Sequence, residues 1–216
     1  MTDVTTLSSL ELSALLCSRV CHDIISPVGA IINGLEVLDD DENNDMEDYA
    51  FELIRKSAKQ ASAKLQFARL AFGAAGSAGA EIDLGDAEQV AVAFLDGEKP
   101  EFTWNSRREI LPKNKVKLIL NLVMISIGAV PRGGSINVDI DPDRENLQVT
   151  ITCSGPAARI PNHAPDLIAG RGGENGIDAH AVQPYYAGLL AKECGMQVQF
   201  ELAGEDVIIK ANPIAG

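Results

Sequence analysis

His22 stands out in this sequence because side chains of complementary chemistry surround it at helical spacing. Asp23 follows it directly, Arg19 comes about one turn before it and Ser26 about one turn after it. A neutral imidazole is a good nucleophile near pH 7 and can carry a phosphoryl group. Asp23 can hold the ring tautomer that leaves the far nitrogen free to attack, and Arg19 can meet the charge of a bound phosphoryl group. His22 is therefore a candidate phosphoryl carrier, and Asp23, Arg19 and Ser26 are the candidate catalytic residues beside it.

Other readings of these residues stay open on their types alone. An exposed helix histidine is more often a solvated side chain than a catalytic group, and Arg19 and Asp23 also fit ordinary surface charges. Cys17 and Cys21 precede His22 in a pattern that superficially resembles a spaced haem-attachment motif. On a helix, however, Cys17 lies about 220° from His22, so these side chains cannot converge on a haem or a zinc ion. We therefore expect no metal site.

A helix over residues 8–38 would position His22, because apolar residues recur along this stretch at a period close to 3.6. At about 100° per residue, the stripe expected to face the core lies about 160° to 220° from His22. Its members are Val20, Ile24, Ile31, Leu35 and Leu38. His22 is therefore expected to point outward from the packed side of the helix.

The helix face around His22 carries small or polar side chains. They are Ser18, Arg19, Ser26, Gly29 and Asn33. Ile25 and Ile32 border this face at about 60° to 80° from His22. An accessible histidine among small residues with an apolar rim is typical of a docking surface for another protein. We expect Ile25, Gly29, Ile32 and Asn33 to contact that partner, although the isoleucines would also fit a widened bundle seam.

A second helix is expected from about Asp45 to Phe72, after an acidic turn over residues 39–44. Acidic residues gather in its first turns and basic residues follow, as the helix dipole prefers. A helix of about 30 residues is roughly 45 Å long, and two such helices alone cannot cover each other's apolar stripes. An antiparallel hairpin that pairs with a second copy as a four-helix bundle would cover them. We predict a homodimer.

Small residues over 73–80 are expected to link the hairpin to a second domain. The predicted domains are 1–75 for the dimerisation hairpin and 82–216 for an α/β domain. Helices are expected near 85–95, 112–130 and 181–194, and strands near 101–105, 135–140, 147–153, 196–202 and 206–211. Residues 154–177 are expected to form a long loop. The fold class is therefore α+β, with helices on one face of a sheet.

The net charge of −13, from 18 Lys and Arg against 31 Asp and Glu, argues against nucleic-acid and anionic-membrane partners because both would be repelled. Four cysteines do not make a disulfide framework at this length. No secretion signal opens the sequence, and no apolar run approaches about 18 residues. We expect a cytoplasmic protein with free thiols.

Residues 22–31, HDIISPVGAI, resemble the phosphoacceptor box of bacterial sensor histidine kinases. That box has a His, an acid, two further residues, a Ser, Thr or Asn and then a Pro, on the first helix of a dimeric hairpin. The resemblance implies that His22 is phosphorylated. It also accounts for Pro27 inside a helical pattern, where proline removes a backbone hydrogen bond.

Residues 117–127 and 150–157 resemble the nucleotide-binding boxes of the kinase ATPase domain, with key groups replaced. Ile125 stands where that family has a magnesium ligand, and Cys153 stands where it has the Asp that reads adenine. Residues 170–176 are glycine-rich, but no G-x-G-x-G string leads into the last helix. We expect a degenerate kinase-ATPase-like α/β sandwich that binds no ATP, no metal and no cofactor of its own.

A kinase-like hairpin beside such a domain resembles the ChpT-type histidine phosphotransferases over nearly the whole chain. The resemblance implies a dimer that accepts phosphate from the receiver domain of a CckA-like hybrid kinase. It would pass the phosphate to the receivers of CtrA-like and CpdR-like cell-cycle regulators. The receiver would bring Mg²⁺ and an aspartate, and the second domain would become a docking surface, for which Arg159 and Arg171 are candidates.

Two other functions stay open. An ATP-dependent histidine kinase would label itself from ATP, which the missing boxes argue against. A non-catalytic, kinase-like scaffold would keep its activity when His22 is replaced by Ala, whereas a phosphotransferase would lose relay and still bind receivers. The remaining histidines, His163 and His180, are expected to be structural or solvated.

Overall fold

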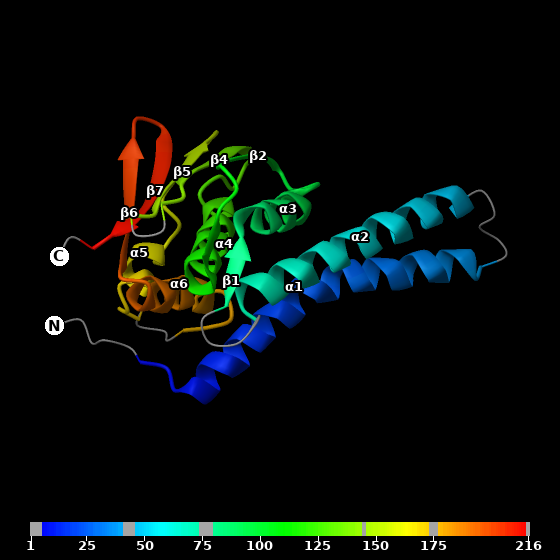
Figure 1. Ribbon diagram of the computed structural model, residues 1–216. Coiled ribbons are helices and arrows are strands. Elements are labelled where there is room, and N and C mark those ends of the chain that lie inside the picture. The colour runs from blue at the N-terminus through cyan, green and yellow to red at the C-terminus, as the bar shows by residue number, and fades with distance from the viewer. Residues whose placement is uncertain (1–5, 41–45, 74–79, 144–145, 173–176, 215–216) are drawn as a thin grey trace.

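The computed structural model describes residues 6–40, 46–73, 80–143, 146–172 and 177–214. A long helical hairpin projects from a domain in which helices pack on a sheet (Figure 1). This arrangement confirms the α+β fold class expected from the sequence. Most of the turn expected over 39–44 and most of the linker expected over 73–80 lie outside the described residues.

The hairpin consists of α1 (Ser9–Leu38) and α2 (Glu47–Ala71). Ser8 and Glu11 form a capping box at the start of α1, where each side chain accepts a hydrogen bond from the other's backbone N–H. The helices approach closely at Gly34, where an added Cβ would lie 2.6 Å from Cγ1 of Ile54. Both helices and their antiparallel pairing agree with the prediction.

The side of α1 that faces α2 differs from the stripe expected from periodicity. The buried residues of α1 are Pro27 and Gly34, which lie about 120° to 140° from His22. Leu35, expected in the core stripe, is 49% exposed. The reason is local. Gly34 has no side chain and so allows α2 to approach closely, and Gly34 and Pro27 therefore form the contact with α2 while larger apolar residues lie on either side of it.

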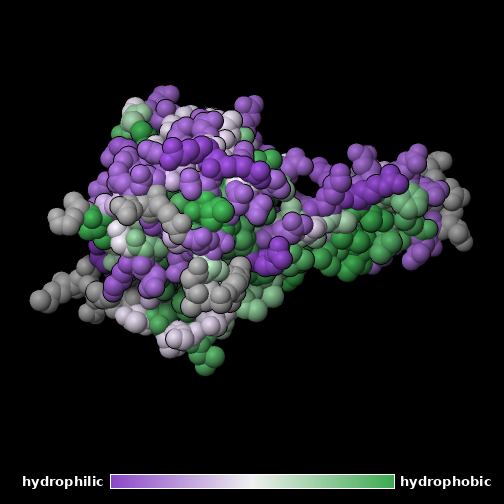
Figure 2. Space-filling view, viewed as in Figure 1, coloured by the Kyte–Doolittle hydropathy of each residue, from purple (hydrophilic) through white to green (hydrophobic). Residues whose placement is uncertain are grey.

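Exposed apolar residues of α1 follow one another at alternating spacings of four and three, as in a coiled-coil seam. We call this row the α1 seam: Cys21, Ile25, Val28, Ile32 and Leu35. A second exposed row lies on α2 at a spacing of seven: Phe51, Ala58 and Leu65. Figure 2 shows a band of hydrophobic side chains along the projecting hairpin.

By length and composition α1 is apolar enough to cross a membrane, although no continuous apolar run of that length occurs in the sequence. The helix is amphipathic, because it carries the ion pair of Arg19 and Asp23 among its apolar residues. It also packs along α2. Apart from Leu10 near its start, the large exposed apolar residues of α1 lie in one seam, as they do on helices that pack in bundles.

The second domain extends from β1 to β7. Its helices are α3 (Leu84–Leu95), α4 (Lys113–Ile127), α5 (Ala164–Ile168) and α6 (Val182–Glu193). Its strands are β1 (Glu81–Asp83), β2 (Pro100–Asn105), β3 (Ile110–Pro112), β4 (Gly134–Asp141), β5 (Gln148–Ser154), β6 (Met196–Ala203) and β7 (Asp206–Pro213). The main sheet has the order β2-β4-β5-β7-β6, and only the β2–β4 pair within it is parallel. Strands β1 and β3 form a separate antiparallel pair.

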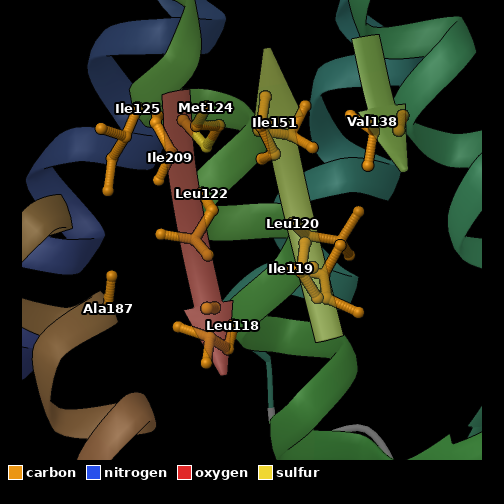
Figure 3. Close-up of a cluster of buried hydrophobic side chains, with 14 of the residues drawn as sticks. Leu118, Ile119, Leu120, Leu122, Met124, Ile125, Val138, Ile151, Ala187 and Ile209 are labelled. Carbon is orange, nitrogen blue, oxygen red and sulfur yellow. The ribbon is translucent and has the colours of Figure 1, made fainter. Parts of the chain in front are cut away.

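Helix α4 lies at the centre of the core. Its residues from Val116 to Ser126 are all buried, because α4 packs against both the sheet and α6. Figure 3 shows Leu120 and Leu122 of α4 beside Ile151 of β5 and Ile209 of β7. Alternating burial along β4, β5 and β7 confirms that helices cover one face of the sheet.

The last turns of α2 enter the same core. Phe67 and Ala71 are buried in the cluster that contains the α3 and α4 side chains. Phe67 stacks on Phe94 with ring centroids 4.1 Å apart, and the Asn121 side-chain amide donates to the carbonyl of Ala71 at 3.2 Å. The hairpin and the second domain are therefore packed together at the base of the hairpin.

The short elements β1, β3 and α5 were not predicted, and α5 interrupts the stretch 154–177 that was expected to be a loop. Each has only three to five residues, which is too few to show a hydrophobic period.

Candidate functional site

His22 lies on α1 with 64% of its side chain exposed. Its Nδ1 lies 3.5 Å from Oδ1 of Asp23, at the long end of the hydrogen-bond range. A carboxylate only accepts hydrogen bonds, so Nδ1 carries the proton and Nε2 keeps its lone pair. This geometry is compatible with the tautomer expected from the sequence, in which the far ring nitrogen would be the one to attack.

Arg19 is held by two partners. Its Nε donates to Oδ2 of Asp23 at 3.0 Å, and its Nη1 lies 3.2 Å from Nδ1 of His180. The side chains of Arg19 and Asp23 are mostly buried, at 18% and 23% exposure. A half-desolvated pair of this kind keeps its geometry better than a surface ion pair does.

His180 belongs to the second domain and lies just before α6. Its ring meets the ring of His22 edge to face, with centroids 5.1 Å apart and planes at 79°. The sequence expectation that His180 is only structural or solvated is therefore incomplete. Arg19 and His180 are 161 residues apart in the chain, and no local pattern could have joined them.

Asp178 fixes the backbone at His180. Its Oδ1 accepts from the N–H groups of His180 and Ala181 at 2.8 and 2.7 Å. The hydrogen bond from Ala181, with contributions from His180 and Arg19, holds the pKa of the Asp178 carboxyl below its usual value. The Asp178 side chain therefore stabilises the turn that leads into α6.

The expected docking residues lie on the exposed face of α1 beside His22. Ser26 and Asn33 are exposed, and an added Cβ on Gly29 would meet no atom within 4 Å. Ile25 and Ile32 are 69% and 51% exposed and belong to the α1 seam. Ser26 therefore shares the face of His22, and the isoleucines lie between that face and the rest of the seam.

The residues aligned with a nucleotide site do not fit a nucleotide. Asn121 is fully buried, and its side-chain amide donates to backbone carbonyls of α2 and α4. Ile125 and Cys153 lie in the hydrophobic core, and burial raises the pKa of the Cys153 thiol to about 12. The Oδ1 of Asn121 has no hydrogen-bond partner but is buried, so these positions offer no accessible magnesium ligand and no accessible adenine acceptor.

The two loop arginines that were candidates for docking differ in their surroundings. Arg171 forms an ion pair with Asp166 at 2.8 Å, and Arg159 is exposed. Residues 173–176 of the expected glycine-rich stretch lie outside the described residues. In the described part of the chain, no group of three or more metal-ligating side chains comes together.

Comparisons with known proteins agree on one family. Residues 84–206 match the family model described as the histidine phosphotransferase C-terminal domain. Protein phosphotransferase ChpT of Brucella abortus (strain 2308) is 53% identical over 206 residues, which cover 95% of this chain and 97% of that protein. A solved structure of a bacterial phosphotransferase superposes with a TM-score of 0.89 at 51% identity, covering 96% of this chain and 98% of the other.

Proposed function

The chain belongs to the histidine phosphotransferase family, and on that premise we propose that His22 is the residue that carries the phosphoryl group. The observation that carries this proposal is the exposed His22 ring whose Nδ1 faces the carboxylate of Asp23. In that contact Nδ1 carries the proton, so the lone pair of Nε2 remains for attack on the phosphorus.

The reaction begins with a receiver domain phosphorylated on an aspartate. The Nε2 lone pair of His22 attacks the phosphorus, an N–P bond forms, and the O–P bond of the acyl phosphate breaks. The electron pair of that bond leaves with the receiver's carboxylate. The His22 ring then bears positive charge, which the Asp23 carboxylate next to Nδ1–H compensates. Transfer to a second receiver reverses these steps.

Arg19 supplies the local positive charge. The phosphoryl group must approach a site that already contains the carboxylates of Asp23 and Asp178. A guanidinium offers five N–H donors, and the contacts to Asp23 and His180 use two of them. The remaining donors are available to phosphoryl oxygens, while Mg²⁺ comes with the receiver.

The receiver docks on the His22 face of α1. Ser26, Gly29 and Asn33 leave room there, and Ile25 and Ile32 supply apolar contact at its edge. The partners proposed are the receiver of a CckA-like hybrid kinase and the receivers of CtrA-like and CpdR-like regulators, in a cytoplasmic, cell-cycle phosphorelay. The net charge of −13 requires this docking to be local.

A homodimer completes the hairpin. Val28 and Leu35 of the α1 seam and the exposed row on α2 present apolar side chains at the spacings of a coiled-coil interface, whereas Ile25 and Ile32 lie at the edge of the seam nearest His22 and are assigned to the receiver. Large exposed residues in these rows include Val28, Leu35 and Leu65 at 40%, 49% and 51% exposure. Pairing two hairpins into a four-helix bundle would remove them from water, which favours association.

ATP takes no part in this proposal. Ile125 and Cys153 lie in the core at positions where the kinase boxes have polar groups, and Asn121 is engaged with Ala71. Incubation of the purified protein with radiolabelled ATP should leave it unlabelled. Label on His22 from ATP alone would favour the kinase alternative instead.

The decisive experiment mixes the purified protein with a phosphorylated CckA-like receiver. Acid-labile phosphate should move to the wild-type chain and should be absent from His22→Gln. The matched control His163→Asn removes an exposed histidine outside the site and should be labelled like the wild type. Equal labelling of His22→Gln would contradict the assignment, and failure with CckA-like, CtrA-like and CpdR-like receivers would contradict the relay.

A further inference from the structure

The second domain contributes the side chain of His180 to the surroundings of His22. The Nδ1 of His180 lies 3.2 Å from Nη1 of Arg19. A guanidinium has donors and no acceptor, so Nδ1 must accept and the proton of His180 must be on Nε2. His180 and His22 therefore hold opposite tautomers, each fixed by a charged neighbour.

We propose that His180 is a positioning residue for phosphoryl transfer at His22, acting through Arg19 and through edge contact with the His22 ring. This inference rests on the proposed function of His22. Asp23 holds one side of the Arg19 guanidinium at 3.0 Å, and His180 holds the other at 3.2 Å. With both contacts in place, the guanidinium cannot rotate away from the site, and its remaining donors stay available to the phosphoryl group.

The contact between the two rings also limits the rotamers of the His22 side chain. An exposed imidazole on a helix can sample several rotamers, and only some of them present Nε2 to a docked receiver. The edge-to-face packing of His180 at 5.1 Å restricts that sampling. Holding a nucleophile in an attacking geometry before the partner arrives raises the rate of the transfer itself.

Contacts elsewhere keep His180 in place. Asp178 caps the backbone at His180 and Ala181. The hydroxyl of Tyr185 on α6 accepts from the N–H of Leu7, next to the start of α1, at 3.2 Å. The side-chain amide of Gln183 donates to the carbonyl of Asn121 at 3.3 Å. The first turn of α6, which directly follows this segment, is thus bonded to Leu7, just before α1, and to α4.

His180 takes no part in the bond changes. The N–P bond forms at Nε2 of His22 and the acyl O–P bond of the receiver breaks, while His180 keeps its proton on Nε2. The expected effect of its removal is therefore on the maximal rate, and the affinity for the receiver should be preserved.

The test measures kcat and KM for transfer from a phosphorylated CckA-like receiver to the full-length protein. His180→Ala should lower kcat about tenfold with KM within about twofold. His180→Asn places an amide oxygen near the position of Nδ1, can still accept from Arg19, and should recover most of the rate. His180→Gln reaches the position of Nε2 instead and should resemble His180→Ala.

Two further variants separate positioning from a general structural effect. Arg19→Ala should lower kcat at least as much as His180→Ala. The double variant should lose less than the product of the two single losses, because the two residues share the Arg19–His180 contact while the His180 ring contact with His22 is lost only with His180. The matched control His163→Asn should keep the wild-type kcat. His180 is exposed, so the melting temperature of His180→Ala should stay close to that of the wild type.

The outcomes distinguish the two proposals. Wild-type kcat in His180→Ala, equal loss in His180→Asn, or a change confined to KM would each overturn the positioning role while His22→Gln still abolishes labelling. Labelling of His22→Gln at the wild-type level would overturn the proposed function, and the role of His180 with it.

Discussion

At the scale of residues, the site depends on which ring nitrogen carries the proton. The carboxylate of Asp23 sets this for His22 at 3.5 Å, and the guanidinium of Arg19 sets the opposite tautomer for His180 at 3.2 Å. Asp23 also pairs with Arg19, so a single carboxylate contacts both the proposed nucleophile and the cation. The four side chains therefore act as one network, and their individual replacements should not be additive.

Asp23→Asn is expected to lower the rate of phosphoryl transfer about 100-fold. The amide carries no charge to compensate the His22 ring, and its NH₂ group can stabilise the wrong tautomer. The measurement is single-turnover transfer from a phosphorylated receiver. Glu36→Gln removes an exposed carboxylate elsewhere on α1 and should leave the rate unchanged. An equal loss in both variants would contradict the specific role of Asp23.

The reactivity of the cysteine thiols should depend on their burial. Burial raises the pKa of Cys153 to about 12 and that of Cys194 to about 11, so neither forms a thiolate at pH 8. Iodoacetamide at pH 8 should modify these two only after denaturation, as read by peptide mass spectrometry. Because the pKa of Cys153 in the folded chain lies above the usual thiol value of 9.0, raising the pH from about 9 towards 12 should favour the unfolded chain. Rapid modification of Cys153 in the native protein would contradict its burial.

At the scale of elements, replacing either of two glycines of α1 by alanine is expected to change the stability of the protein in opposite directions. A Cβ on Gly34 would lie 2.6 Å from Ile54, whereas a Cβ on Gly29 meets nothing within 4 Å. Gly34→Ala should destabilise the protein by about 1–3 kcal/mol through overpacking of the hairpin. Gly29→Ala should stabilise it by roughly 0.5–1 kcal/mol, because alanine loses less entropy in a helix.

The measurement for this pair is urea unfolding at one fixed protein concentration. Each glycine is the control of the other, since both substitutions add the same methyl group to the same helix. A stabilising effect of Gly34→Ala would mean that α1 and α2 pack less closely than the structure shows.

The long elements could be predicted from the sequence, and the short ones could not. The helices α1 and α2 show their apolar period over 30 and 25 residues, which is a strong signal. The strands β1 and β3 have three residues each and exist because they pair with one another. The face of α1 that contacts α2 was also predicted wrongly. The prediction used the spacing of apolar residues alone, and that spacing does not show the close approach that Gly34 permits.

At the scale of the whole molecule, the hairpin and the second domain form one packed body. Phe67 and Ala71 at the end of α2 share the core with α3 and α4, and Asn121 bonds to Ala71 rather than facing a nucleotide. A domain held in this way can place His180 beside His22. The same packing leaves the α1 seam uncovered at the far part of the hairpin (Figures 1 and 2).

Val28→Glu should convert the proposed dimer to a monomer, because a carboxylate without a partner would be buried in the seam. Light scattering after gel filtration should show the mass fall from twice 23.0 kDa to 23.0 kDa. Lys59→Glu introduces the same carboxylate at an exposed position of α2 outside the seam and should remain dimeric. Cys21, which lies in the seam, should react faster with iodoacetamide in Val28→Glu. A monomeric wild type would contradict the bundle.

The sequence by itself determined the helices of the hairpin, the α+β class, and the neighbours of His22 on its own helix. These depend on spacings of one to four residues, where helical geometry fixes which side chains meet. Only the tertiary structure places His180 beside Arg19, from which it is separated by 161 residues in the chain. It also shows that Asn121 donates a hydrogen bond to the end of α2, and which apolar residues of α1 stay exposed. Those contacts depend on how the second domain packs on the hairpin, and packing between distant segments leaves no period in the sequence.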